Sequence, residues 1–346
     1  MVATLLAGSI AVLHTAVLLS GVIEFSRVQS SSILLISAGI FCHLIWSVQR
    51  AYLIATERFS VLGVLNFLHL SSALVVPVMV IAIFNLSDSI SVLLIPYFLF
   101  RLLLLVAFSG LLPSLKFLPR AILKKKIKDL LEQGKWMGTS NLISQIFEGM
   151  ERYFLSFLGP ISLVPSYHIP LQLSQKLAVF PQALSTVLFS RLSKGESLNR
   201  ELLTLISVLL IPISGLFMIL NEPVLLVWLG SALQAEMISI SAITFIAMAF
   251  ASMNFIISGT AEATGLSEKA AKIDLAMVLP AIVLSFYLIY FFNITGAAFA
   301  LLLRELTFFV IRLKLISGAF NSKQNVVISA LILLLLLFLE ISTPIL

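Results

Sequence analysis

The chain has 346 residues, of which 60% are hydrophobic and 11% are charged. An average soluble domain has about 25% charged residues, so this composition excludes a water-soluble globular protein and predicts an all-α, polytopic integral membrane protein. The net charge of +6 does not indicate nucleic-acid binding, because the basic residues lie in alternate connections, as membrane topology requires.

Apolar runs of about 20 residues, the length that a helix needs to cross the bilayer core, recur along the chain. Helices are expected because backbone groups in lipid must form hydrogen bonds within their own segment. We therefore predict about eleven transmembrane helices. The predicted spans are residues 3–23, 32–54, 62–85, 89–112, 135–158, 162–190, 201–220, 237–258, 273–292, 294–313 and 325–343.

The connections between these spans predict the orientation of the chain. Seventeen of the 22 Lys and Arg residues fall on one side of the membrane, whereas Arg27 alone falls on the other. Because cytoplasmic loops carry the excess of basic residues, we expect Met1 to be cytoplasmic and Leu346 periplasmic. The longest polar connection, residues 113–134, contains the amphipathic stretch AILKKKIKDLLEQ, which we expect to lie along anionic headgroups of the membrane lipids.

An internal repeat indicates two related halves. At an offset of 208 residues, Ala55-Thr56 aligns with Ala263-Thr264 and Phe84-Asn85 with Phe292-Asn293. Spans two to four then correspond to spans eight to ten, which predicts parallel six-helix lobes. The first half lacks counterparts of spans five and six, so its lobe is expected to be incomplete, and whether Met1 is the true start stays open. The predicted parts are an N-lobe of four helices (1–112), a basic cytoplasmic loop (113–134), a C-lobe of six helices (135–322) and an additional C-terminal helix (323–346).

Spans five and six are the most polar segments of the chain. Their polar residues recur at three- and four-residue spacing and so form a stripe along each helix. Such a stripe indicates either a hydrated solute pathway or an internal polar seam. Three prolines in span six predict that it is bent or locally unwound. The candidate pathway residues are Gln145, Arg152, Gln172, Gln175 and Lys176, and the candidate ion-coupling residues are Glu148 and Glu151.

Two further arginines, Arg101 and Arg304, lie in the middle of spans four and ten. Charged residues at this depth are costly and commonly functional. Because guanidinium binds phosphate oxygens in a bidentate manner, both are candidates for binding an anionic substrate group. The alternative is structural pairing with Glu148, Glu151 or Glu305. We interpret Asp274, at the start of span nine, as a charge that interacts with the helix N-terminus.

The chain shows no sign of an enzyme active site. It has no phosphate-binding Walker loop, its histidines are scattered, and Cys42 is its one cysteine. A metal site would need ligands at defined spacing. We therefore predict a protein that is not an enzyme and that has no catalytic residues, no metal and no cofactor.

The segment from Gly134 to Ser193 resembles polysaccharide-repeat (O-antigen) flippases of the multidrug/oligosaccharidyl-lipid/polysaccharide (MOP) exporter superfamily. The resemblance is carried by the Gly-x-Trp start, by the acidic-Arg pair Glu151-Arg152, by a Pro-containing helix and by an exit that reads FSRLS. The stretches EPVLLVWLG, GTAEATGLSEKAAKID and ITGAAFALLLRE are also similar to this family. Members begin with two further helices, which this chain does not show.

The resemblance implies two six-helix lobes around a central cavity in the bacterial inner membrane, with Glu151, Arg152 and Lys176 on the C-lobe wall. The implied function is translocation of an oligosaccharide linked to undecaprenyl pyrophosphate by alternating access, and coupling to H⁺ or Na⁺ is a further hypothesis. Which sugar is carried stays open. The alternatives are a multidrug-type exporter of the same superfamily, a nonfunctional truncated remnant and a membrane-embedded polysaccharide polymerase.

Overall fold

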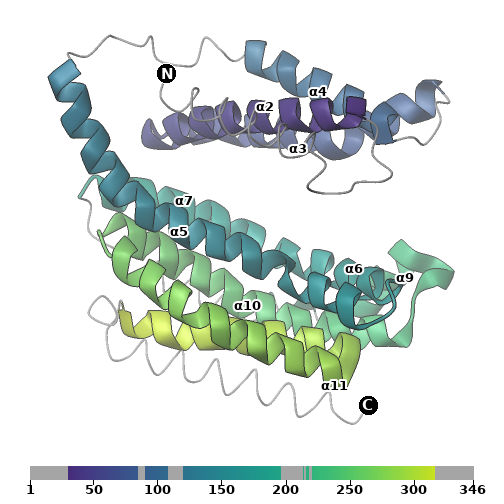
Figure 1. Ribbon diagram of the computed structural model, residues 1–346. Helices are drawn as coiled ribbons and strands as arrows, with labels where there is room; N and C mark the ends of the chain where they lie inside the picture. The colour runs from purple at the N-terminus through teal and green to yellow at the C-terminus, as the bar shows by residue number, and fades with distance from the viewer. Residues whose placement is uncertain are drawn as a thin grey trace. The chain divides into compact units, whose positions relative to one another are not determined.

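The structure, a computed structural model, describes residues 30–84, 90–107, 120–195, 213, 216–217 and 220–315 (Figure 1). Every element in these ranges is helical, which agrees with the predicted all-α class. Two compact units divide the chain, unit 1 (residues 1–117) and unit 2 (residues 118–346). The predicted spans 3–23 and 325–343, and nearly all of 201–220, lie outside the described residues.

Unit 1 contains three described helices, α2 (Ser30–Ala55), α3 (Phe59–Phe84) and α4 (Ile90–Ala107). They correspond to the predicted spans 32–54, 62–85 and 89–112. Helix α4 packs against both α2 and α3. A small apolar cluster that includes Trp46 and Leu62 joins α2 to α3. The three helices therefore share one packed interior.

Unit 2 is built around a buried central helix. Its elements are α5 (Arg120–Leu158), α6 (Leu163–Gln175), η2 (Lys176–Ala178), α7 (Val179–Ser193), α9 (Asn221–Leu229), η3 (Gly230–Ala232), α10 (Ala235–Ala263) and α11 (Ser267–Leu315). Helix α10 packs against α6, α7 and α11. It can be buried along nearly its whole length because its residues are mostly small or apolar.

Helix α5 begins earlier than the sequence predicts. The predicted span covers residues 135–158, whereas the helix starts at Arg120. The segment treated as a connecting loop is therefore helical and continuous with the span. Strong helix formers such as Leu, Lys, Glu and Gln fill this segment, and they favour helix in water as well as in lipid. At 1.5 Å per residue, the helix is roughly twice as long as the bilayer core is thick.

The predicted irregularity in span six is present. A 3₁₀ turn, η2, separates α6 from α7, and it follows Pro170 and precedes Pro181. Proline removes a backbone donor and crowds the preceding turn of a helix, so the polar residues around Lys176 lie where the helix changes its winding.

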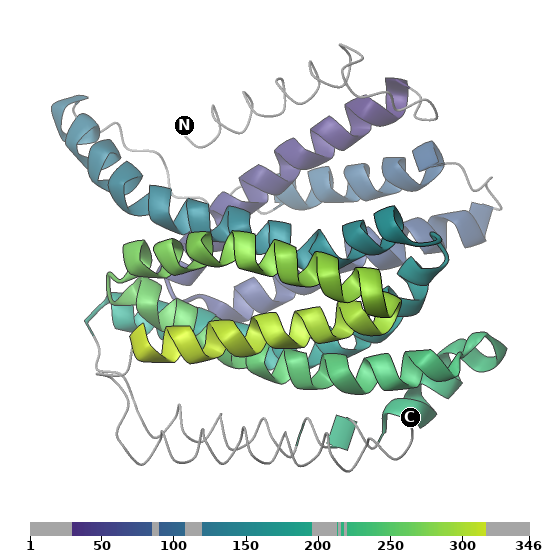
Figure 2. The same cartoon turned by 60° about the horizontal axis from the view of Figure 1, so that its bottom comes forward.

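Helix α11 is a hairpin of two antiparallel limbs (Figure 2). Its backbone leaves the helical region at Asn293, where φ is 48° and ψ is −125°. Asp274 in the first limb and Arg312 in the second form an ion pair at 2.5 Å, which requires the limbs to run back alongside one another. The limbs match the two predicted spans 273–292 and 294–313.

Within the described residues, two helices are long and apolar enough to cross a membrane, Ala235–Ala263 and Ser267–Lys314. The second of these contains both limbs of the hairpin. Shorter apolar stretches occur at Phe59–His69 and Ile95–Leu104. The total of eleven spans stays a prediction.

The turn of the hairpin requires glycine at position 296. A Cβ atom there would lie 2.0 Å from the carbonyl oxygen of Leu288, so the limbs could not approach as closely. We expect Gly296→Ala to cost about 1–3 kcal/mol, as overpacking does elsewhere, measured as a lower thermal midpoint of the detergent-solubilised protein. Gly138→Ala is the control, because nothing lies within 4 Å of its Cβ position. An unchanged midpoint for Gly296→Ala would contradict this geometry.

Candidate functional site

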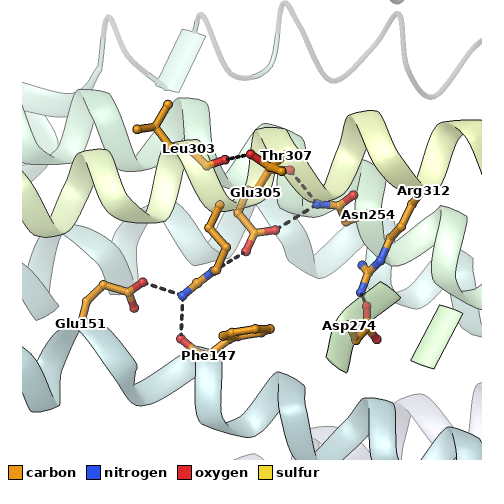
Figure 3. Close-up of polar contacts among 9 residues, drawn as sticks. Phe147, Glu151, Asn254, Asp274, Leu303, Glu305, Thr307 and Arg312 are labelled. Carbon is orange, nitrogen blue, oxygen red and sulfur yellow. Dashed lines mark hydrogen bonds and ion pairs between the residues drawn. The ribbon is translucent and has the colours of Figure 1, made fainter. Parts of the chain in front are cut away.

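A buried ion pair joins α5 to the second limb of α11. The Nη1 atom of Arg304 lies 2.5 Å from Oε1 of Glu151, and the two side chains are 4% and 2% exposed. The same Nη1 atom donates a hydrogen bond of 3.0 Å to the carbonyl oxygen of Phe147, whose ring lies beneath the guanidinium. In Figure 3, the carboxylate of Glu151 and the backbone carbonyl of Phe147, both from α5, bind the same nitrogen atom.

Glu305 and Asn254 extend this pair to α10. The Nε atom of Arg304 lies 3.3 Å from Oε1 of Glu305. Asn254 donates hydrogen bonds of 3.0 Å to the Oε2 atom and to the carbonyl oxygen of Glu305 (Figure 3). We call Glu151, Arg304, Glu305 and Asn254 the central network. Because leaving a charge unpaired in this interior would be costly, the network ties α5, α10 and α11 together.

A second ion pair joins the two limbs of α11 at the open end of the hairpin, away from its turn. Asp274, 1% exposed, accepts hydrogen bonds from Arg312 and from the hydroxyl of Ser140. It therefore connects both limbs of α11 to α5. The sequence interpretation of Asp274 as a charge at a helix N-terminus missed this pair, because Arg312 lies 38 residues away and only the hairpin brings it near.

A different set of polar residues remains exposed on unit 2. We call this set the polar stripe, and its members are Gln145, Glu148, Arg152, His168, Gln172 and Lys176. His168 and Arg152 are half-buried and the other four are exposed. The Nε2 atoms of Gln172 and His168 are 2.9 Å apart, and the charge of Arg152 on α5 reaches the ring of His168 on α6. The stripe thus has members on α5 and α6 and at the 3₁₀ turn η2.

Arg152 forms no ion pair in the described structure with Glu148, the acidic residue one helical turn before it. Its Nη2 atom donates to the backbone carbonyl of Glu148 at 3.1 Å, and no ion pair joins the two side chains in the described structure. The carboxylate of Glu148 and most of the guanidinium of Arg152 are therefore available to a ligand. Gln175, beside the stripe, is half-buried.

Arg101 belongs to unit 1. It is 8% exposed, and its guanidinium carbon lies 4.3 Å from the centre of the Tyr97 ring. Its Nε atom is buried and has no hydrogen-bond partner in the described structure. The two arginines predicted as equivalent thus differ: Arg304 is neutralised by its own unit, and no carboxylate partner is described for Arg101.

The described residues contain no group of three or more His, Cys, Asp or Glu side chains that could hold a metal ion. The site residues that the sequence predicts therefore divide by environment. Glu151 and Arg304 are internal and paired, which is the structural alternative that the sequence left open. Gln145, Glu148, Gln172 and Lys176 are exposed, and Arg152 is half-buried.

The known proteins to which this chain is similar include transporters. No protein-family model matches the chain. A Shigella flexneri protein described as a "putative O-antigen transporter" is 26% identical over 181 residues. This match covers 50% of the chain but only 43% of the relative, so the chain aligns with less than half of that protein.

Two solved structures share the fold of the chain. One is an outward-facing multidrug resistance MATE family transporter of the MOP superfamily, with a TM-score of 0.68 and 15% identity over 95% of this chain and 77% of the other. The second is a MATE structure in the straight conformation, with a TM-score of 0.67 and 15% identity over 91% and 78%. The chain is therefore distantly homologous to an O-antigen-type transporter and has a MATE-like fold, in agreement with the predicted resemblance.

The central network predicts a specific pattern of stability. Arg304→Met leaves two carboxylates facing each other without a cation, and we expect it to cost about 3–5 kcal/mol. The double variant Glu151→Leu with Arg304→Met should lose less than the sum of the single changes. Thermal unfolding in detergent measures each midpoint, with the exposed Arg191→Gln as control. Strictly additive losses would show that Glu151 and Arg304 do not depend on each other.

Proposed function

From this homology and this fold, we propose that the chain is a membrane transporter that moves an anionic, lipid-linked oligosaccharide across the bilayer by alternating access. The observation that carries the proposal is the polar stripe, in which Lys176 is exposed and Arg152 is half-buried within the predicted spans of unit 2. A charged side chain in contact with hydrocarbon costs several kcal/mol. Exposed charges on predicted spans therefore require water or a polar ligand beside them.

The composition of the stripe supports an anionic substrate with hydroxyl groups. Arg152 and Lys176 outnumber the single carboxylate, Glu148, so the stripe favours negative charge. Guanidinium binds phosphate oxygens through paired hydrogen bonds, and ammonium does so as a point charge. Gln145 and Gln172 offer amide donors and acceptors that suit sugar hydroxyls. A carrier pyrophosphate with attached sugars, such as an O-antigen or exopolysaccharide repeat unit on undecaprenyl pyrophosphate, combines both features.

The membrane arrangement that we propose follows the distribution of basic residues. About eleven helices cross the bacterial inner membrane, with Met1 in the cytoplasm and Leu346 in the periplasm. The incomplete N-lobe covers residues 1–112 and the C-lobe residues 135–322. The helix at 120–134 lies on the cytoplasmic side, where Lys124 to Lys128 can interact with anionic headgroups.

The central network has a supporting role in this mechanism. It holds α5, α10 and α11 together through a buried ion pair and shared hydrogen bonds. Helix α5 carries Glu151 toward the interior and Arg152 toward the polar stripe. The network therefore keeps the stripe in a fixed geometry while access to it alternates.

A multidrug-type exporter is the second candidate function. One of the two similar solved structures is a multidrug resistance transporter, and the exposed side of α5 next to the stripe carries the aromatic residues Tyr153 and Phe157, 73% and 82% exposed. Such a surface suits apolar cations rather than a pyrophosphate. The charge of the transported molecule distinguishes the two functions.

The proposed function predicts that loss of stripe cations slows translocation. Proteoliposomes would contain undecaprenyl pyrophosphate bearing a fluorescent oligosaccharide, and a membrane-impermeant quencher would report its movement between leaflets. We expect Arg152→Gln and Lys176→Gln each to reduce the rate about tenfold, since each removes one charge-assisted contact of about 1.5–3 kcal/mol. Arg191→Gln, an exposed arginine of α7 outside the stripe, is the matched control. Wild-type protein that moves an apolar cation but not this lipid would contradict the proposal and favour the multidrug exporter.

Ion coupling, if carried by the stripe, depends on Glu148. Glu151 is committed to Arg304, whereas Glu148 is exposed and has no ion pair among the described residues. We expect Glu148→Gln to remove the acceleration of transport by an imposed H⁺ or Na⁺ gradient while leaving the rate without a gradient within about twofold. Rates in the same proteoliposomes with and without each gradient measure this. Full acceleration in Glu148→Gln would exclude this carboxylate as the coupling group.

A further inference from the structure

Unit 1 contains a buried cation on a helix bundle, α2–α4, whose helices carry no acidic side chain. Arg101 lies in the interior of α4 and is 8% exposed. The sequences of α2, α3 and α4 contain no Asp or Glu at any position. The helices that pack around Arg101 therefore cannot supply a carboxylate to balance its charge.

In unit 2, carboxylates balance the buried charge of Arg304. There the guanidinium has Glu151 at 2.5 Å and Glu305 at 3.3 Å. A buried charge whose partner is missing costs several kcal/mol, and burial without a hydrogen-bond partner adds to that cost. In the described structure, Arg101 contacts the face of Tyr97, and such a cation–π contact is weaker than a buried ion pair. This difference points to a further anion that is not part of α2–α4.

The groups described around Arg101 are polar side chains without a carboxylate. Its charge reaches the Cys42 thiol and the rings of His43 and His69. His43 is exposed. Trp46 stacks on His69 with ring centres 4.7 Å apart. The buried Nε atom of Arg101, a donor without a partner in the described structure, is free to bind an oxygen atom.

We propose that Arg101 is the centre of a binding site in unit 1 for a phosphate or pyrophosphate group. Guanidinium is suited to this chemistry because its donors match adjacent phosphate oxygens, and Tyr97 holds its plane in position. The identification of the ligand as the pyrophosphate of the lipid carrier rests on the proposed function. A phospholipid headgroup offers the same chemistry, so the experiment must compare the two sources.

Trp46 provides a reporter for this site. The chain has three tryptophans, so a variant with Trp136→Phe and Trp228→Phe leaves Trp46 alone, next to His69. The purified full chain in detergent would be titrated with undecaprenyl pyrophosphate, inorganic pyrophosphate and phosphatidylglycerol. We expect a saturable change in Trp46 fluorescence with both pyrophosphates, and a roughly tenfold or greater loss of affinity in Arg101→Gln. Arg58→Gln, an exposed arginine between α2 and α3, should bind as the parent does.

The outcomes separate this proposal from the proposed function. No saturable change with any probe, or equal affinity in Arg101→Gln, would overturn the anion site even if translocation is intact. Saturable, Arg101-dependent binding in a protein that moves no lipid-linked sugar would support the site and overturn the transport function. Equal affinity for phosphatidylglycerol would support the anion site but assign it to bilayer lipid. Should Arg101→Gln fail to fold, Arg101→Lys is the second variant. It keeps the charge but lacks the paired N–H donors of the guanidinium, so it should weaken pyrophosphate binding.

Discussion

The buried ion pair between Arg304 and Glu151 is the interaction on which the arrangement of unit 2 depends. Two charges that are 4% and 2% exposed are tolerated in this interior only if they remain together and hydrogen-bonded. Their partners come from α5, α10 and α11, so satisfying the charges also specifies how these helices pack. The Asp274–Arg312 pair applies the same constraint where the ends of the hairpin meet α5.

The charges of the polar stripe and of Arg101 differ from these pairs, because no ion pair within the described residues neutralises them. Glu151 and Arg152 are consecutive, and about 100° of helix rotation separates an internal, paired carboxylate from a guanidinium at the surface of α5. One helix therefore carries both a buried structural charge and the charge that the proposed function uses to bind its substrate. In the proposed function, the second kind binds the anionic group of a lipid-linked substrate.

Sequence reasoning predicted local features well and long-range partners poorly. The break at Asn293 was predictable because a polar residue interrupts two apolar runs, and the irregular helix around Lys176 because prolines flank it. The sequence alone could not show whether Arg304 pairs with Glu151 or binds a substrate, because 153 residues separate the two side chains. Only the packing of α11 against α5 brings them together. The helix at 120–134 was missed because a span was defined by hydropathy, whereas Lys and Glu also favour helix.

The central claim, that the polar stripe contacts water at membrane depth, is tested most directly by thiol accessibility along α5. In a Cys42→Ser background, single cysteines at Gln145, Glu148 and Arg152 would be compared with cysteines at Leu142, Ile146 and Phe157, which are exposed on the apolar side of the same helix. A charged, membrane-impermeant methanethiosulfonate requires a hydrated thiolate. We predict rapid labelling of the first three positions and little labelling of the other three. Equal labelling of both sets, or none of the stripe positions, would contradict the account.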